Sequence, residues 1–158
     1  MNEDENIGIA RASPALHRVI VKLTWIVYKS DNGIMRVTSA STTILLVEDD
    51  QTIRELAAAM LAADGYRVLS AATAQDALDV LARHPDVALI FSDVQMPRCD
   101  GLSMVRQLRR RGIAIPTLLT SGLHTPDPGT LPPRTGFLPK PYRRADLLAA
   151  LDRLQTEH

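Results

Sequence analysis

The feature that most limits the fold is the apolar run at residues 87–91, which leads into Ser92 and Asp93 and is soon followed by Pro97. An apolar run without alternating polar residues is typical of a strand buried on both faces of a parallel sheet. Open α/β sheets place their reactive groups at the carboxyl ends of the strands, so Asp93 is expected at the rim of a crevice. A single aspartate in such a place would more often form a turn or cap a helix.

Strand-like and helix-like patterns alternate from residue 44 onward. Short apolar runs predict five strands, at residues 44–47, 66–71, 87–93, 113–120 and 136–138. The segments after the first, second, third and fifth strands show apolar residues at helical spacing. Their expected inner faces are Ile53, Leu56, Met60 and Leu61; Ala74, Ala77, Leu78 and Leu81; Leu102, Val105 and Leu108; and Leu147, Ala150, Leu151 and Leu154.

The segment after the fourth strand breaks this alternation. Residues 124–134 contain four prolines, which remove amide donors and clash with the preceding helical turn, so a loop or a single turn is expected there. Five β-α units with a defective fourth predict a doubly wound parallel α/β sheet, with helices on both faces and the fourth helix short or missing.

The first 42 residues read as an N-terminal extension to a domain at residues 43–158. Residues 21–25 alternate like a strand, and the apolar residues around them also fit a helical face; their β-branched content favours a strand. Residues 31–33 predict a turn, and residues 38–43 have the composition of a linker. Met35 is an alternative start of the natural protein.

Charge and cysteine content narrow the class of protein. The eighteen basic and eighteen acidic side chains balance, so the chain has no net positive charge that would attract a polyanion. No direct DNA binding is therefore expected. The arginines at residues 106 and 109–111 fit the solvated C-terminus of a helix. Cys99 is the single cysteine, and no stretch is apolar for long enough to cross a membrane. A cytoplasmic protein without membrane contact, monomeric or weakly dimeric, is expected.

Polar residues follow four of the five predicted strands. Glu48 and Asp49 follow the first, Asp93 ends the third, Thr120 ends the fourth and Lys140 follows the fifth. Each alone could be a helix cap or a solvated charge, and Asp50 is expected to be a cap. Three carboxylates at one edge of a sheet would repel one another without a cation, and oxygen ligands with open water positions suit Mg²⁺. A lysine beside them would favour binding of a phosphoryl group.

Four motifs together resemble the receiver domain of two-component response regulators over roughly residues 43–155. They are Leu46-Val47-Glu48-Asp49-Asp50, Ser92-Asp93-Val94-Gln95-Met96-Pro97, Leu119-Thr120-Ser121-Gly122 and Leu138-Pro139-Lys140-Pro141. The resemblance is to single-domain, chemotaxis-regulator-like receivers and implies a flavodoxin-like sheet of strand order 2-1-3-4-5. It also implies a cis peptide bond between Lys140 and Pro141.

The resemblance assigns a role to each residue of the site. Asp93 would accept a phosphoryl group from a histidine kinase or a histidine phosphotransfer protein. Asp49, Asp93 and the backbone carbonyl of Gln95 would bind Mg²⁺, with Glu48 acting through water. Lys140 would pair with the phosphoryl oxygens. Thr120 would donate its hydroxyl to the phosphoryl group and, with Phe137, form the switch.

The expected function is a Mg²⁺-dependent phosphoacceptor in a phosphorelay, without a covalent output domain. Such a protein is not an enzyme in the usual sense, because it catalyses only its own phosphorylation and dephosphorylation. One alternative is a phosphatase of the haloacid dehalogenase type, which uses an aspartate nucleophile. Gln95 stands where that class carries a general acid, which argues against it. Another is a binding module that works without phosphorylation.

Overall fold

The computed structural model describes residues 25–29, 35–39, 41–123 and 125–156, which fall into two compact units, Met1–Ala40 and Ser41–His158. In the first unit, strands β1 (Trp25–Lys29) and β2 (Met35–Ser39) pair antiparallel, with Val27 opposite Val37. The predicted turn at residues 31–33 and most of the strand predicted at residues 21–25 lie outside the described residues. The linker predicted at residues 38–43 is wrong at both ends, because Thr38 and Ser39 belong to β2 and Thr43 begins the next strand.

The second unit is built on a five-stranded parallel sheet of order β4-β3-β5-β6-β7, which confirms the predicted strand order. Its strands are β3 (Thr43–Val47), β4 (Arg67–Ala71), β5 (Val87–Asp93), β6 (Thr117–Ser121) and β7 (Thr135–Pro139). Every residue of β3 is buried, as its apolar sequence predicts. The fourth strand begins only after Pro116, four residues later than residue 113, where it was predicted.

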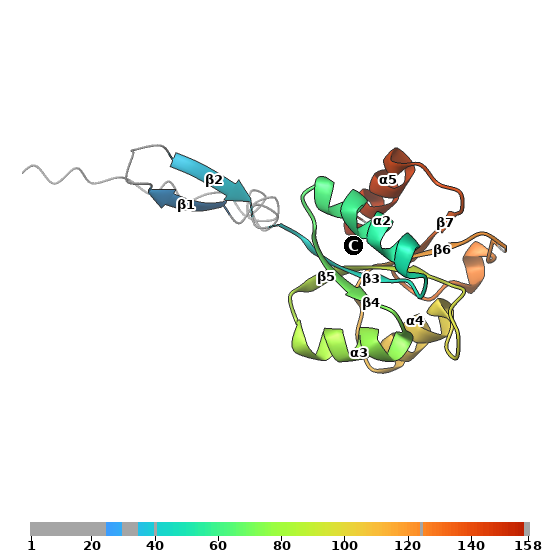
Figure 1. Ribbon diagram of the computed structural model, residues 1–158. Coiled ribbons are helices and arrows are strands. Elements are labelled where there is room, and N and C mark those ends of the chain that lie inside the picture. The colour runs from blue at the N-terminus through green and yellow to red at the C-terminus, as the bar shows by residue number, and fades with distance from the viewer. Residues whose placement is uncertain (1–24, 30–34, 40, 124, 157–158) are drawn as a thin grey trace, which may run out of the picture. The chain divides into compact units, whose positions relative to one another are not determined.

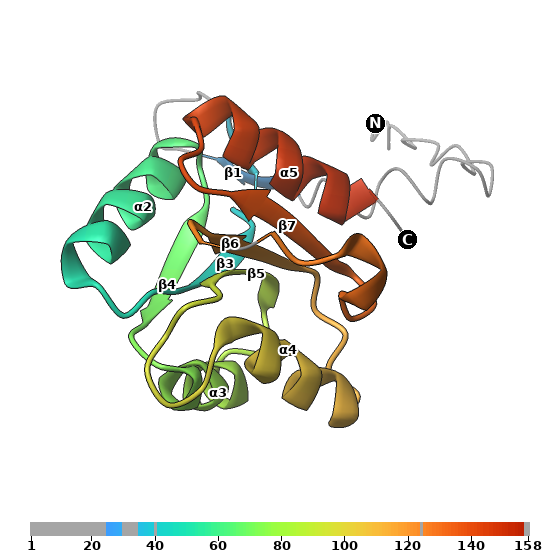
Figure 2. The same cartoon turned by 90° about the vertical axis from the view of Figure 1, so that its right-hand side faces the viewer.

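Four helices cover the two faces of the sheet (Figures 1 and 2). Helices α2 (Gln51–Ala63) and α5 (Arg144–Thr156) lie on one face, and α3 (Ala74–Arg83) and α4 (Gly101–Arg110) lie on the other. Asp50 caps α2 by accepting a hydrogen bond from the Ile53 amide, and Thr73 caps α3 in the same way. Gly65 follows α2 with a φ of +86°, a left-handed conformation that glycine adopts without strain.

The helices bury most of the faces that their sequences predict, with one exception. All four predicted inner residues of α5 are buried, namely Leu147, Ala150, Leu151 and Leu154. In α2, however, Ala57 and Leu61 face the core, whereas Ile53 and Leu56 are 42% and 66% exposed. The predicted inner face of this helix was therefore wrong at Ile53 and Leu56.

Where the structure describes it, the proline-rich segment between β6 and β7 forms no α-helix, as predicted. Its described part contains one short 3₁₀ turn, η1 (Pro128–Thr130), which Asp127 caps by accepting a hydrogen bond from the Gly129 amide. The chain then enters β7 through Arg134, whose φ is +56°. No helix among the described residues has the length and apolarity needed to span a membrane.

Candidate phosphoacceptor site

The carboxyl ends of four strands bring the predicted site residues together. Glu48 directly follows β3, Asp93 ends β5 and is paired in register with Thr120 of β6, and Lys140 directly follows β7. Neighbouring parallel strands end at the same edge of a sheet, so residues far apart in the sequence meet there. This register explains why the four motifs form one site.

Three carboxylates form the acidic part of the site. One carboxylate oxygen from each of Glu48, Asp49 and Asp93 lies within 4.8 Å of the other two. Glu48 and Asp93 are only 4% and 8% exposed, while Asp49 faces solvent. Burial raises the pKa of the Glu48 carboxyl, and the hydrogen bond from the Asp50 amide and the charge of Lys140 offset this only in part.

Lys140 is the cation of the site. Its Nζ donates to Asp93 Oδ2 at 3.0 Å and to Glu48 Oε2 at 3.4 Å. Burial lowers the pKa of Lys140, but the hydrogen bond to Asp93 and the negative charges of Asp93 and Glu48 outweigh it, so the pKa lies above its ordinary value. The Lys140 amide donates to Ser121 O, and the Lys140–Pro141 bond is cis, as the resemblance implies.

The side-chain hydroxyl of Thr120 is buried without a hydrogen-bond partner among the described residues. Its Oγ1 is inaccessible to solvent and makes no hydrogen bond to any of the residues that the structure describes. A buried hydroxyl without a partner is unfavourable by about 1 to 3 kcal/mol, which makes it a ready donor for an oxygen placed beside it. Thr120 is paired in register with Asp93, so the residue that carries this hydroxyl lies beside the one that carries the buried carboxylate.

The remaining predicted residues lie around this centre. The Gln95 amide donates to Asp93 Oδ1 at 3.1 Å, which places the residue against the carboxylate, and its side chain is exposed. Phe137 is half-buried in β7, opposite Leu119 of β6. The metal-binding role of the Gln95 carbonyl and the switch role of Phe137 stay predictions.

Two further residues position the site, and the sequence reasoning missed both. Arg54 reaches back from α2, and its Nη1 donates to Glu48 O at 2.7 Å and Asp49 O at 3.3 Å, which fixes the acidic loop. Gly101, the first residue of α4, lies so close to Asp93 that a Cβ there would overlap the Asp93 carbonyl oxygen. The Asp100-Gly101 pair is typical of a helix start, whereas no sequence signal indicates the contact of Arg54.

An apolar groove of about 470 Å³ opens beside Lys140. One wall comes from α2 and includes Ile53, Leu56 and Met60, and the other includes Pro141 and Tyr142. The Tyr142 ring packs edge-on against Phe91, with ring centroids 5.9 Å apart, and burial raises the pKa of its hydroxyl. The groove therefore has a fixed aromatic wall and a second wall made of exposed aliphatic side chains.

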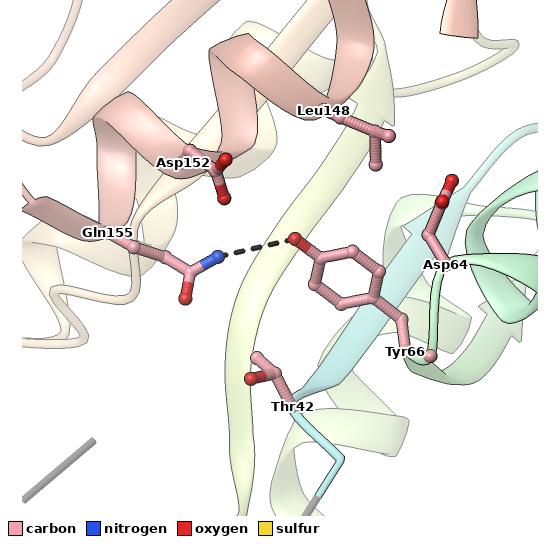
Figure 3. Close-up of a pocket in the computed structure, with 7 residues that line it drawn as sticks. Thr42, Asp64, Tyr66, Leu148, Asp152 and Gln155 are labelled. Carbon is pink, nitrogen blue, oxygen red and sulfur yellow. Dashed lines mark hydrogen bonds between the residues drawn. The ribbon is translucent and has the colours of Figure 1, made fainter. Parts of the chain in front are cut away.

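A second pocket lies at the opposite, amino-terminal edge of the sheet (Figure 3). There Tyr66 accepts a hydrogen bond from Gln155 Nε2 at 3.3 Å, and Asp152 and Leu148 of α5 line the same pocket. Asp64 on its rim forms an ion pair with Arg144. Burial raises the pKa of Tyr66. This pocket has no part in the cluster around Asp93.

A doubly wound sheet with three carboxylates, a hydroxyl and a lysine at its carboxyl edge defines a phosphoacceptor class of signalling domain. The chain belongs to the response regulator receiver domain family, whose sequence model matches residues 44–152. This membership confirms the family inferred from the four motifs and excludes the haloacid dehalogenase alternative.

Curated relatives and solved structures agree with this assignment. The chain is 37% identical to response regulator MprA of Mycobacterium bovis over 114 residues, which cover 70% of this chain and 49% of that protein. It thus spans about half the length of the curated relatives it matches. Chemotaxis protein CheY4 of Vibrio cholerae superposes with a TM-score of 0.66 at 29% identity, covering 73% of this chain and 99% of CheY4.

A receiver domain from the hybrid histidine kinase CckA is also similar. Its TM-score is 0.61 at 32% identity, and the alignment covers 72% of this chain and 99% of that domain. A chemotaxis protein and a receiver domain from a hybrid histidine kinase therefore both share this fold.

Proposed function

We propose that Asp93 accepts a phosphoryl group from a phosphohistidine on a histidine kinase or a phosphotransfer protein, in a reaction that depends on Mg²⁺. The observation that carries this proposal is the pairing of the buried Asp93 carboxylate with Lys140 Nζ, beside two further carboxylates. A carboxylate held close to a cation can act as a nucleophile without a general base.

The donor set fits Mg²⁺. Asp49 and Asp93 offer carboxylate oxygens, and the Gln95 carbonyl lies on the residue whose amide contacts Asp93. Glu48, the third carboxylate of the cluster, would act through water. These are hard oxygen ligands, and no histidine or cysteine belongs to the cluster. When bound, the ion would neutralise charge that spreads over the phosphoryl oxygens during transfer.

The residues of the chain would divide the remaining work. An oxygen of Asp93 attacks phosphorus in line with the leaving imidazole; the new O–P bond forms as the P–N bond breaks, and the electron pair stays on the imidazole nitrogen. Lys140 moves from Asp93 Oδ2 to a phosphoryl oxygen. Thr120 donates its unpartnered hydroxyl to another phosphoryl oxygen.

The donor protein would pack in the apolar groove beside Lys140. Ile53, Leu56 and Leu123 are the exposed large hydrophobic residues of the described part of the chain, with Leu123 81% exposed. Ile53 and Leu56 line the groove, and Leu123 follows Gly122, which also lines it. Exposed apolar surface that gathers at the mouth of a reactive site favours contact with a protein donor over a small molecule.

Labelling with acetyl phosphate and Mg²⁺ tests the acceptor. The wild-type chain is expected to gain a phosphoryl label that hydroxylamine removes, and Asp93→Asn is expected to gain none. Asp79→Asn is the control, because Asp79 is an exposed residue of α3 whose carboxylate accepts a hydrogen bond from Gln75 and lies outside the acidic cluster. An equal label on Asp93→Asn would refute the assignment, and an unlabelled wild type would favour a phosphorylation-independent binding module.

A further inference from the structure

One arginine anchors the segment that stands where the fourth helix would be. The Arg109 guanidinium donates to Pro133 O at 2.8 Å, Ile113 O at 2.7 Å, Ile115 O at 2.9 Å and Arg134 O at 3.3 Å. Burial lowers the pKa of Arg109, and the charge of Arg134 lowers it further. The side chain is held by four main-chain carbonyls, so it fixes the proline-rich segment against the end of α4.

This anchoring creates a hollow between α4 and the proline-rich segment. It has a volume of about 340 Å³ and is lined by Arg106, Arg109, Arg110, Thr130 and Pro132. Arg106 and Arg110 are one helical turn apart, so their guanidinium groups project from the same side of α4. Both are exposed, and neither side chain forms an ion pair or hydrogen bond with the residues that the structure describes.

We propose that this hollow binds an acidic segment of a partner polypeptide, with carboxylates on Arg106 and Arg110 and an apolar side chain against Pro132. The guanidinium fork is suited to carboxylates, and no acid of the described chain neutralises this pair. Arg134 adds a third positive charge nearby, as its effect on Arg109 indicates. The hollow is preformed because four main-chain carbonyls hold Arg109 in place, and a preformed site lowers the ordering cost of binding.

A peptide fits this hollow better than a nucleic acid does. The volume suits a few side chains, and the ring of Pro132 with the stems of the arginines provides apolar contact, which a phosphate backbone would not use. The chain has no net charge that would attract a long polyanion. Arg109 contacts the strand entries and Asp93 lies at the strand ends, so peptide binding and phosphorylation are expected to be separable.

Fluorescence anisotropy with a labelled peptide of repeating glutamate-glutamate-leucine triplets tests the proposal. The double variant R106E/R110E is expected to weaken binding by about ten-fold or more, because two attractive pairs become repulsive. R153E is the matched control, since Arg153 is also an exposed arginine and belongs to α5, on the other face of the sheet. Acetyl phosphate labelling of both variants should equal that of the wild type, which verifies folding.

Three results would overturn the proposal. The first is undetectable peptide binding at about 1 mM protein. The second is equal weakening by R153E, which would indicate a general charge effect. The third is tighter binding of a labelled DNA duplex than of the peptide with the same dependence on Arg106 and Arg110, which would assign the hollow to nucleic acid.

Discussion

Gly101→Ala is predicted to damage both the stability of the domain and its phosphorylation. The added Cβ would overlap the carbonyl oxygen of Asp93 and lie 3.0 Å from Ser92 Oγ and 3.1 Å from the carbonyl carbon of Asp93. These atoms belong to the end of a central strand, so the backbone of α4 or of β5 must shift. Overpacking of this kind lowers the free energy of unfolding by about 1 to 3 kcal/mol.

The shift would also displace the nucleophile. Gly101 donates its amide to Val94 O at 2.8 Å, so the start of α4 and the loop after Asp93 move together. A displacement of about 1 Å at a reacting group can slow a reaction by about a hundred-fold. We therefore expect Gly101→Ala to lower the initial rate of labelling by acetyl phosphate by a factor between about ten and about a hundred.

Gly112→Ala is the matched control. Gly112 has a φ of +78°, but no atom lies within 4 Å of the added Cβ, so the substitution introduces backbone strain without a clash. Strain of this type lowers stability by about 1 to 2 kcal/mol. Urea denaturation should thus give similar losses for both variants, while only Gly101→Ala should slow labelling. Equal labelling rates for the two variants would refute the role of Gly101.

Three further predictions concern the cation, the groove and the remote pocket. Lys140→Met should lower the free energy of unfolding by about 3 kcal/mol, which is the low end of the range for a buried ion pair, because Lys140 is partly exposed. Mg²⁺ should raise the melting temperature of this variant more than that of the wild type. An equal effect of Mg²⁺ on the two proteins would contradict this prediction. Replacing Ile53 and Leu56 with serine should slow transfer from a phosphorylated donor protein but leave labelling by acetyl phosphate unchanged, and parallel losses in both assays would argue against a docking groove. Because the pKa of Tyr66 is raised in the fold, its stabilising effect is complete below the unfolded value of about 10 and is lost as pH rises towards the folded value. Tyr66→Phe should therefore lose less stability above about pH 10 in urea denaturation than the wild type does, and an identical pH dependence would show that Tyr66 does not contribute.

The sequence could predict those parts of the fold that depend on one segment at a time. The four inner residues of α5 recur at helical spacing, so its buried face could be predicted from that segment alone. In α2 every residue from 56 to 63 is apolar, so spacing does not single out one face, and contact with the sheet selects Ala57 and Leu61 over Ile53 and Leu56. The fourth strand was predicted too early, because apolarity does not reveal that Arg109 binds the carbonyls of Ile113 and Ile115.

The candidate site was predictable for a similar reason. Each of its residues comes directly at the end of an apolar run, and the geometry of a parallel sheet brings such ends together. The close approach of Gly101 to Asp93 and the contact of Arg54 with the acidic loop depend on how helices dock against strand ends. Those distances are properties of the packed domain and not of any single motif.

The anchoring of the proline-rich segment by Arg109 has a consequence for how this region can change in evolution. The guanidinium group recognises carbonyl oxygens, which every amino acid supplies, so this contact does not itself depend on which side chains stand at residues 113, 115, 133 and 134. Substitutions could accumulate along this stretch and give related chains different outer surfaces, while the entry into β7, and with it the position of Lys140, stays the same.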